Sequence, residues 1–171
     1  SHGFKDSHIV FMADTNHPQL RDLALLEAVF VEATKKNPNI RLLLFGEHLP
    51  AWKHSWFKHV ADIKETEAAF AGADAFVHPA VYDPCAPGVL QAMATGLPVL
   101  TTKDIGSAKL VRESGGATLL SLAGDGASDK WTKAVLELAS DEELRQQRGT
   151  AARQAVAQRT LESFVDELET I

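Results

Sequence analysis

The sequence predicts a single α/β domain over residues 1–171, with a mostly parallel six-stranded sheet and helices on both of its faces. Apolar stretches of strand length alternate with amphipathic stretches of helical period, which is the order that produces parallel sheets flanked by helices. The apolar run at residues 8–13 has the character of a central strand that is buried on both faces. The length fits one domain, and no linker or repeat divides it.

Six segments have the length and the apolar character of strands. They cover residues 8–13, 41–45, 56–60, 75–79, 97–101 and 118–121. The third segment is the weakest, because its alternation of apolar and polar residues is slight. The first segment is expected at the centre of the sheet.

Helical stretches lie between these strands and after the last one. The clearest runs from residue 19 to residue 36, where apolar residues recur at three- and four-residue spacing. Further helices are expected at residues 63–71, 88–95 and 107–113, around Trp131, at 141–159 and, as a last amphipathic segment, at 161–168. Three of these helices carry capping signals at their N-termini, namely Asp62 with Glu65, Ser128, and Ser140 with Glu143.

Composition restricts the partners and the location. The formal net charge of −6 argues against a nucleic-acid partner, because binding polyphosphate requires a surplus of Lys and Arg. No apolar run approaches the ~20 residues of a membrane span, and the start has no signal-peptide pattern. The single Cys85 cannot form an internal disulfide, so we expect a cytoplasmic compartment, with peripheral attachment of a longer protein to the inner face of the membrane left open. The start at Ser1, without Met, is interpreted as a tag scar or as a cut from a longer polypeptide.

The residues that carry chemistry lie between positions 73 and 120. A strand is followed by a loop with Pro84 and Pro87, and then by a helix whose first turn opens with Gly88. Glycine lets a ligand approach the backbone, and the free N–H groups of a helix start attract anions. This helix start would lie beyond the carboxyl ends of the strands, which is where open α/β sheets bind ligands. A phosphate site is one interpretation, and a helix start that binds nothing is the other.

This stretch resembles the C-terminal domain of family 4 retaining glycosyltransferases of the GT-B fold, including the lipopolysaccharide core glucosyltransferases. The resemblance rests on ADAFVHP at residues 73–79 and QAMATGLPV at 91–99, and extends through GGATLL at 115–120 to DEELR at 141–145 and AAR at 151–153. It implies a Rossmann-like lobe that binds a nucleotide diphosphate sugar as donor, without an obligatory metal. It also implies that the acceptor-binding N-terminal lobe is absent from this chain, and that the acceptor is a glycan or a lipid-linked sugar.

The resemblance also assigns roles to individual residues. In the family two carboxylates bracket the donor, and they correspond here to Asp83, which contacts the sugar, and Gln91, which bonds the ribose hydroxyls. The alternative for Asp83 is a turn residue before Pro84, which we favour less than the sugar contact, and the alternative for Gln91 is a surface helix residue. The backbone of Gly88, Val89 and Leu90 is expected to hold the diphosphate.

Family members neutralise the diphosphate with a Lys and an Arg near the first strand. Arg21 corresponds to the Lys and can grip phosphate, although a solvated helix residue is the alternative. Asp14 falls near the Arg position and would repel a diphosphate unless it points elsewhere. Gly46 stands at the turn after the second strand, near the expected base site, and Gly106 stands in the loop under the donor phosphates.

The seven histidines do not indicate a metal site, because they lack the helical pairing or the cysteine partners of zinc ligands. His78 has a better claim to a functional position, since it lies at a strand end that faces the site, and polar packing in the core is the equal alternative. Two functions therefore remain open. The chain is either the donor-binding half of a retaining transferase, inactive in isolation, or a degenerate domain of the same fold that acts as a nucleotide-sugar sensor or scaffold.

Overall fold

The structure, a computed structural model, describes residues 4–61 and 66–157. Its sheet is made of β1 (Ile9–Asp14), β2 (Ile40–Phe45), β3 (Phe57–Val60), β4 (Ala75–His78), β5 (Val99–Thr101) and β6 (Ala117–Leu119). The helices are the 3-10 helix η1 (Pro18–Leu20), α1 (Leu23–Lys36), α2 (Thr66–Ala71), α3 (Pro87–Ala94), α4 (Ala108–Glu113), α5 (Ala127–Ser140) and α6 (Glu142–Ala157).

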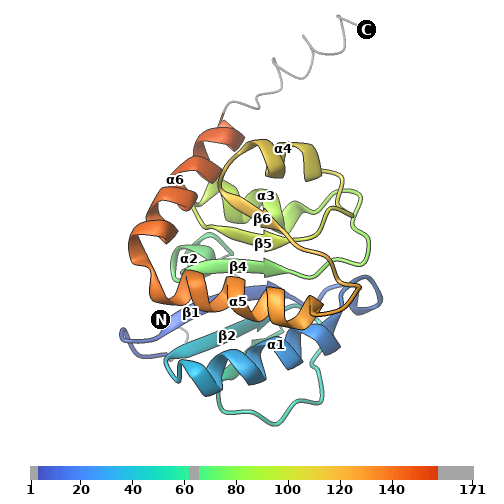
Figure 1. Ribbon diagram of the computed structural model, residues 1–171, viewed down its shortest axis with the longest axis vertical. Helices are drawn as coiled ribbons and strands as arrows, with labels where there is room; N and C mark the ends of the chain where they lie inside the picture. The colour runs from blue at the N-terminus through green and yellow to red at the C-terminus, as the bar shows by residue number, and fades with distance from the viewer. Residues whose placement is uncertain (1–3, 62–65, 158–171) are drawn as a thin grey trace, which may run out of the picture.

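The six strands form one parallel sheet in the order β3-β2-β1-β4-β5-β6, which Figure 1 shows from the side of α1 and α5. Every pair of neighbouring strands is parallel. The strand β1 lies between β2 and β4, so the prediction of a central first strand is confirmed. The strand order is reversed on the two sides of β1, which is the place where doubly wound sheets bind ligands.

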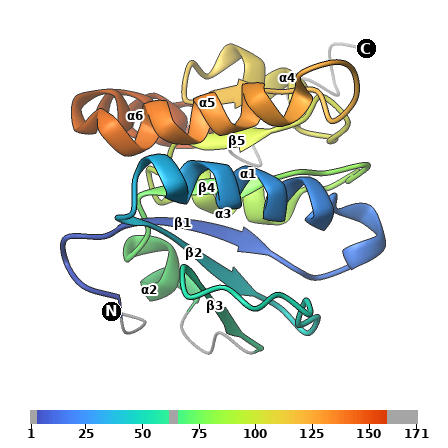
Figure 2. The same ribbon diagram turned by 60° about the horizontal axis from the view of Figure 1, so that its bottom comes forward.

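Helices cover both faces of the sheet, as predicted. On one face α1 and α5 pack against alternate residues of β1, β2 and β4, and on the other α2, α3, α4 and α6 pack against the residues between them. In Figure 2, α1 and α2 lie on opposite sides of β1 and β2. Residues 11, 12 and 13 of β1 are all 0% exposed, so this strand has no polar face. The double burial accounts for its continuous apolar sequence.

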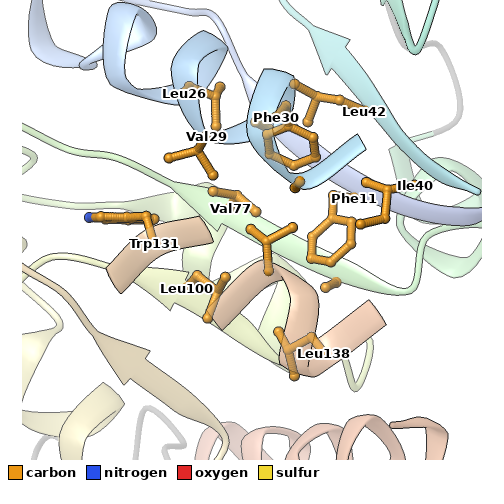
Figure 3. Packing of buried hydrophobic residues seen from close by; sticks show 14 of the residues in the cluster. Phe11, Leu26, Val29, Phe30, Ile40, Leu42, Val77, Leu100, Trp131 and Leu138 are labelled. Carbon is orange, nitrogen blue, oxygen red and sulfur yellow. The ribbon is translucent and has the colours of Figure 1, made fainter. Parts of the chain in front are cut away.

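The core under α1 and α5 is aromatic at its centre (Figure 3). Phe11 of β1 meets Phe30 of α1 edge to face, with ring centroids 5.5 Å apart. Trp131 of α5 is 1% exposed and donates its indole N–H to the carbonyl of Ser121 at 2.9 Å. This bond satisfies the only polar atom of the indole, so the ring can be buried at no hydrogen-bonding cost.

The long helix expected at 19–36 is divided in two. Residues 18–20 form η1, Arg21 is extended with φ −123° and ψ 135°, and α1 begins at Leu23. Asp22 caps α1, because its Oδ1 accepts the N–H of Leu25 at 2.9 Å. The break places Arg21 beside the end of β4 and not on a helix surface.

Two of the predicted capping signals are wrong. The residue before α5 is Gly126, with φ 73°, and Ser128 lies within the helix. Ser140 is the last residue of α5, and its hydroxyl bonds to the carbonyls of Leu136 and Glu137. Asp141 caps α6 in its place by accepting the N–H of Leu144 at 2.8 Å. The predicted pair of Asp62 and Glu65, the last residues of the 141–159 helix and the 161–168 segment lie outside the described residues.

Candidate functional site

An open cleft of about 940 Å³ lies at the carboxyl edge of the sheet. Its walls are the segment after β1 (residues 14–21), the turn after β2 with Glu47 and His48, and the segment from residue 83 to the first turns of α3. Asp14, Arg21, Asp83, Gly88 and Gln91 all line it. Residues that the sequence separates by more than 60 positions therefore meet at the edge where the strand order is reversed.

Backbone hydrogen bonds place Arg21 in this cleft. The segment around it runs antiparallel to the end of β4, with a bridge between Arg21 and Ala80. The N–H of Asp22 donates to the carbonyl of Pro79, and the N–H of Val81 donates to that of Leu20, both at 2.9 Å. The position of Arg21 is thus fixed by the main chain on both sides of it.

The side chain of Arg21 joins two carboxylates that line the cleft. Its Nη2 lies 2.8 Å from Oδ2 of Asp83 and 3.3 Å from Oδ1 of Asp14, and its side chain is only 5% exposed. Nη1 donates to the carbonyl of Leu20 at 3.3 Å, and Nε is buried without a partner among the described residues. The expectation of a solvated Arg21 is wrong. The cation is present in the cleft, but it is already neutralised by the protein.

His78 completes this cluster from the end of β4. It is 1% exposed, and its Nδ1 lies 3.1 Å from Oδ2 of Asp14. Its Nε2 lies 3.2 Å from Oδ2 of Asp83, outside hydrogen-bond geometry. We refer to Asp14, Arg21, His78 and Asp83 as the ionic cluster. Asp14 therefore points at Arg21 and His78, which resolves how a carboxylate can be buried at this position.

Asp83 has a structural role in addition to its place in the cleft. Its Oδ1 accepts the N–H groups of Ala86 at 2.7 Å and Cys85 at 3.3 Å, so it closes the turn that leads into α3. Burial alone would raise the pKa of Asp83, but the Ala86 N–H, Arg21, His78 and the Cys85 N–H together hold this pKa below its ordinary value. Asp83 is therefore an ionised, firmly held carboxylate at the wall of the cleft.

The start of α3 offers fewer free donors than the sequence suggested. Pro87 is its first residue and has no N–H, and Ala86 before it has φ 41°. The N–H groups of Val89 and Leu90 both donate to the carbonyl of Ala86, at 3.0 and 3.3 Å. Among the described residues only the Gly88 N–H of these three is left without an acceptor. Val89 is 0% exposed and belongs to the core, whereas Gln91 is exposed and lines the cleft.

The two other predicted glycines support the cleft without lining it. Gly46 has φ 125°, and a Cβ there would lie 2.7 Å from Oδ1 of Asn16, so glycine lets the turns after β1 and β2 touch. A Cβ on Gly106 would lie 1.8 Å from the carbonyl oxygen of Pro84. The Gly106 N–H also donates to the carbonyl of Asp83 at 2.9 Å. The fit of Gly106 against the loop at 83–85 therefore requires glycine for packing.

Two buried hydroxyls that the sequence analysis did not single out hold the end of β4. Thr101 donates to the carbonyl of His78 at 3.0 Å, and Thr102 donates to that of Ala80 at 2.8 Å. Their signal in the sequence is a pair of threonines directly after an apolar strand. Among the described residues, no group of three or more His, Cys, Asp and Glu is arranged to hold a metal ion. No helix in the described ranges is long and apolar enough to cross a membrane.

The family profile described as glycosyl transferases group 1 matches residues 6–141, which is most of the chain. The chain belongs to the group 1 glycosyltransferase family. No curated protein sequence matches it.

Solved structures agree on the fold of this group 1 domain. WaaG, a glycosyltransferase involved in lipopolysaccharide biosynthesis, superposes with a TM-score of 0.81 at 19% identity, over 97% of this chain and 47% of WaaG. A TarM variant of S. aureus, crystallised with UDP, α-GlcNAc-glycerol and fondaparinux, gives 0.84 at 14% identity, over 96% of this chain and 35% of TarM. The C-terminal domain of the group 1 protein LpcC of Francisella tularensis gives 0.74 at 15% identity, over 89% and 85% of the two chains. The chain thus has the fold of a GT-B domain and spans about half or less of WaaG and TarM.

Proposed function

We propose that this chain is the donor-binding domain of a retaining glycosyltransferase, which transfers a sugar from a nucleotide diphosphate sugar to a glycan or lipid-linked acceptor. The observation that carries the proposal is the cleft at the carboxyl edge of the sheet, where the N-terminus of α3 opens, in a chain of the group 1 family. TarM, which has the same fold in this region, was crystallised with UDP. The acceptor and the rest of the active site would come from a second lobe.

The proposal implies one orientation of the donor in the cleft. The diphosphate lies against the Gly88 N–H, which is the one of the three predicted donors without an acceptor among the described residues, and where the dipole of α3 favours a negative charge. Gln91, exposed on the first turns of the helix, reaches the ribose hydroxyls. The base lies toward Glu47 and His48, at the other wall.

The chemistry that this arrangement supports is departure of the nucleotide diphosphate from the anomeric carbon. The sugar passes through an oxocarbenium-like state while negative charge grows on the leaving group, and the helix start stabilises that charge. Arg21 acts as a positioning residue in the resting cleft, since it holds Asp83 beside the sugar. No metal is required. The isolated chain supplies only one wall of the active site, so we expect it to transfer no sugar.

The scaffold reading has one observation in its favour. Arg21, the cation expected to meet the diphosphate, is bound to two carboxylates and is almost fully buried. A non-catalytic domain that keeps the fold and has lost donor binding would retain this cluster for stability alone. The transferase domain and the scaffold therefore differ in whether the cleft binds a nucleotide diphosphate, whereas a sensor would bind one with no turnover in the full-length protein.

Titration of UDP, GDP and ADP into ¹⁵N-labelled protein tests the proposal. The isolated domain supplies only one wall of the active site and buries the ligand incompletely. We therefore expect a Kd on the order of 0.1–1 mM, which corresponds to a binding free energy of about −4 to −5.5 kcal/mol. Backbone amides at residues 86–91 and 103–107 should shift before any others. Gly88→Val should abolish the response, because a Cβ at Gly88 would lie 3.2 Å from the Phe76 ring and 3.7 Å from Oδ2 of Asp14, so the valine side chain would fill the space beside the free N–H.

The matched control for the titration is Thr95→Val, which changes an exposed residue at the other end of the same helix and should leave the shifts as they are. Amide signals that stay still up to several millimolar of all three nucleotides would exclude the donor site and favour the scaffold. Sugar transfer to an acceptor by the purified 171-residue chain would contradict the requirement for a second lobe.

A further inference from the structure

Asp14 lies at the point where the proposed donor phosphates would meet the protein. A Cβ on Gly88 would lie 3.7 Å from Oδ2 of Asp14, so this carboxylate faces the residue that carries the free helix N–H. Its other oxygen, Oδ1, lies 3.3 Å from Nη2 of Arg21. Asp14 thus lies beside one group that could bind a phosphate and is paired with the other.

The charge of the cleft is unfavourable for an anion. Asp14, Glu47 and Asp83 line it together with a single guanidinium, that of Arg21, which gives a formal charge of −2 with His17 and His48 neutral. Both carboxylates of the ionic cluster are bonded to the same nitrogen of Arg21. A diphosphate that approaches the Gly88 N–H therefore meets a cation whose field is already cancelled, and a buried carboxylate next to it.

We propose that Asp14 is an internal competitor for the donor phosphates. Its carboxylate pairs with Arg21 and repels anions from the start of α3. Asp14 therefore lowers the affinity of the cleft for its ligand, and lowers it more for ligands of higher negative charge. This inference rests on the proposed donor site. Asp83 cannot have the same role, because its Oδ1 is committed to the turn before α3. Within the described residues, the side-chain hydrogen bonds of Asp14 go to Arg21 and His78, and none of them closes a turn.

The effect depends on ligand charge. A competitor that acts through electrostatics weakens a diphosphate more than a monophosphate and leaves an uncharged nucleoside unaffected. Asp14→Asn removes the charge, keeps the shape, and can still bond Arg21 through its amide oxygen and His78 through its amide nitrogen. This substitution therefore separates charge from packing.

The experiment compares the wild-type chain with Asp14→Asn by titration calorimetry and amide shifts. The probes are inorganic pyrophosphate, UDP, GDP and ADP, and then the monophosphate and the nucleoside of whichever base binds best. We expect Asp14→Asn to bind pyrophosphate and the diphosphate about 10-fold more tightly, the monophosphate about 3-fold, and the nucleoside within about 2-fold. The control Glu47→Gln removes the same charge from an exposed wall residue without touching Arg21, and should gain only about 2-fold.

The outcomes separate this inference from the donor site itself. Equal diphosphate affinity in the two proteins overturns the role of Asp14 and leaves the donor site standing. Binding by Asp14→Asn alone supports that role and shows that the natural cleft does not bind the donor, which favours the scaffold. No binding by either protein overturns both proposals. A gain for the nucleoside equal to that for the diphosphate shows a change of shape and overturns the electrostatic role.

A second variant, Asp14→Ser, tests the proposal if Asp14→Asn does not fold. Asp14→Ser removes the carboxylate and should show the same ranking of probes with smaller gains, because it no longer holds Arg21 in place. If neither variant folds, as judged by circular dichroism and amide dispersion, Asp14 is required for the fold and the proposal of a competitor is overturned.

Discussion

Replacing Arg21 with alanine would remove the guanidinium that bridges Asp14 and Asp83 and would leave both carboxylates without it. The two residues are each 7% exposed, so both carboxylates depend on protein groups for most of their stabilisation. His78 stays within 3.2 Å of both carboxylates, so each keeps one polar neighbour in the variant. The variant therefore tests whether the ionic cluster holds the fold together as well as the site.

The expected loss follows from the geometry. Removing one partner of a buried ion pair costs about 3–5 kcal/mol, and the nearby His78 places this case near 3 kcal/mol. For a domain of this size each kcal/mol lowers the melting temperature by roughly 2–4 °C, so the loss in Tm is roughly 6–12 °C. The matched control is Lys35→Ala. Lys35 pairs with Glu32 at 2.6 Å, but the side chains are 64% and 51% exposed, so its loss should lower Tm by no more than about 2 °C.

The dependence on pH identifies the cause. The folded state holds the pKa of Asp83 low, so this carboxylate contributes stability above its unfolded pKa of about 3.9 and loses it as the pH falls through the lower folded value. Removing Arg21 raises that folded pKa and with it the pH at which the carboxylate is neutralised. The difference in Tm between wild type and Arg21→Ala should thus be full at pH 7 and shrink as the pH is lowered from about 5 toward 3.

Calorimetric melts of the two proteins and of the Lys35→Ala control, at pH 7 and at pH 3.5, supply the measurement. A Tm of Arg21→Ala within about 2 °C of wild type at pH 7 would refute the reasoning, since it would show that the buried carboxylates need no cation. A loss that is the same at both pH values would place the cause in packing of the side chain, not in its charge.

The remaining predictions concern two supporting contacts. Gly106→Ala should destabilise the protein by about 1–3 kcal/mol and displace the amide signals of residues 83–86, because its Cβ would overlap the carbonyl of Pro84. The control is Lys103→Ala, at an exposed position in the same loop. Amide signals that do not move in Gly106→Ala would count against the packing role of this glycine. Asp141→Ala should lower the free energy of unfolding by about 1 kcal/mol and Ser140→Ala by less than half of that, because Asp141 caps α6. The reverse ranking in urea-unfolding experiments would indicate that Ser140 is the cap.

The fold could be predicted from the sequence because its signals are local and redundant. Strands buried on both faces read as apolar runs, and their alternation with helices leaves few arrangements other than a parallel sheet. Helix ends were less well determined. Ser140 and Asp141 are adjacent and either could cap α6, and which one does so depends on where α5 ends, a matter of packing that no short pattern records.

The ionic cluster could not be predicted for a different reason. Two of its three hydrogen bonds join residues that are 62 and 64 positions apart, and they form only because β1 and β4 are neighbours and the chain breaks between η1 and α1. Considered alone, Asp14 carries a negative charge where the family has a cation for the diphosphate, and Arg21 carries the expected positive charge. Considered together, the two form an ion pair, and each allows the other to be buried.

This pairing changes how departures from the family pattern are judged. A buried Asp14 without Arg21 would cost several kcal/mol, and so would Arg21 without a carboxylate, so the effects of the two residues on stability are coupled. The acidic residue at position 14 therefore does not by itself argue against donor binding. Donor binding depends on whether a diphosphate can displace Arg21 Nη2 from its contacts with Asp83, at 2.8 Å, and Asp14, at 3.3 Å. The ratio of diphosphate affinities between Asp14→Asn and wild type measures that competition directly, and a ratio near one would mean that the donor never engages Arg21 at all.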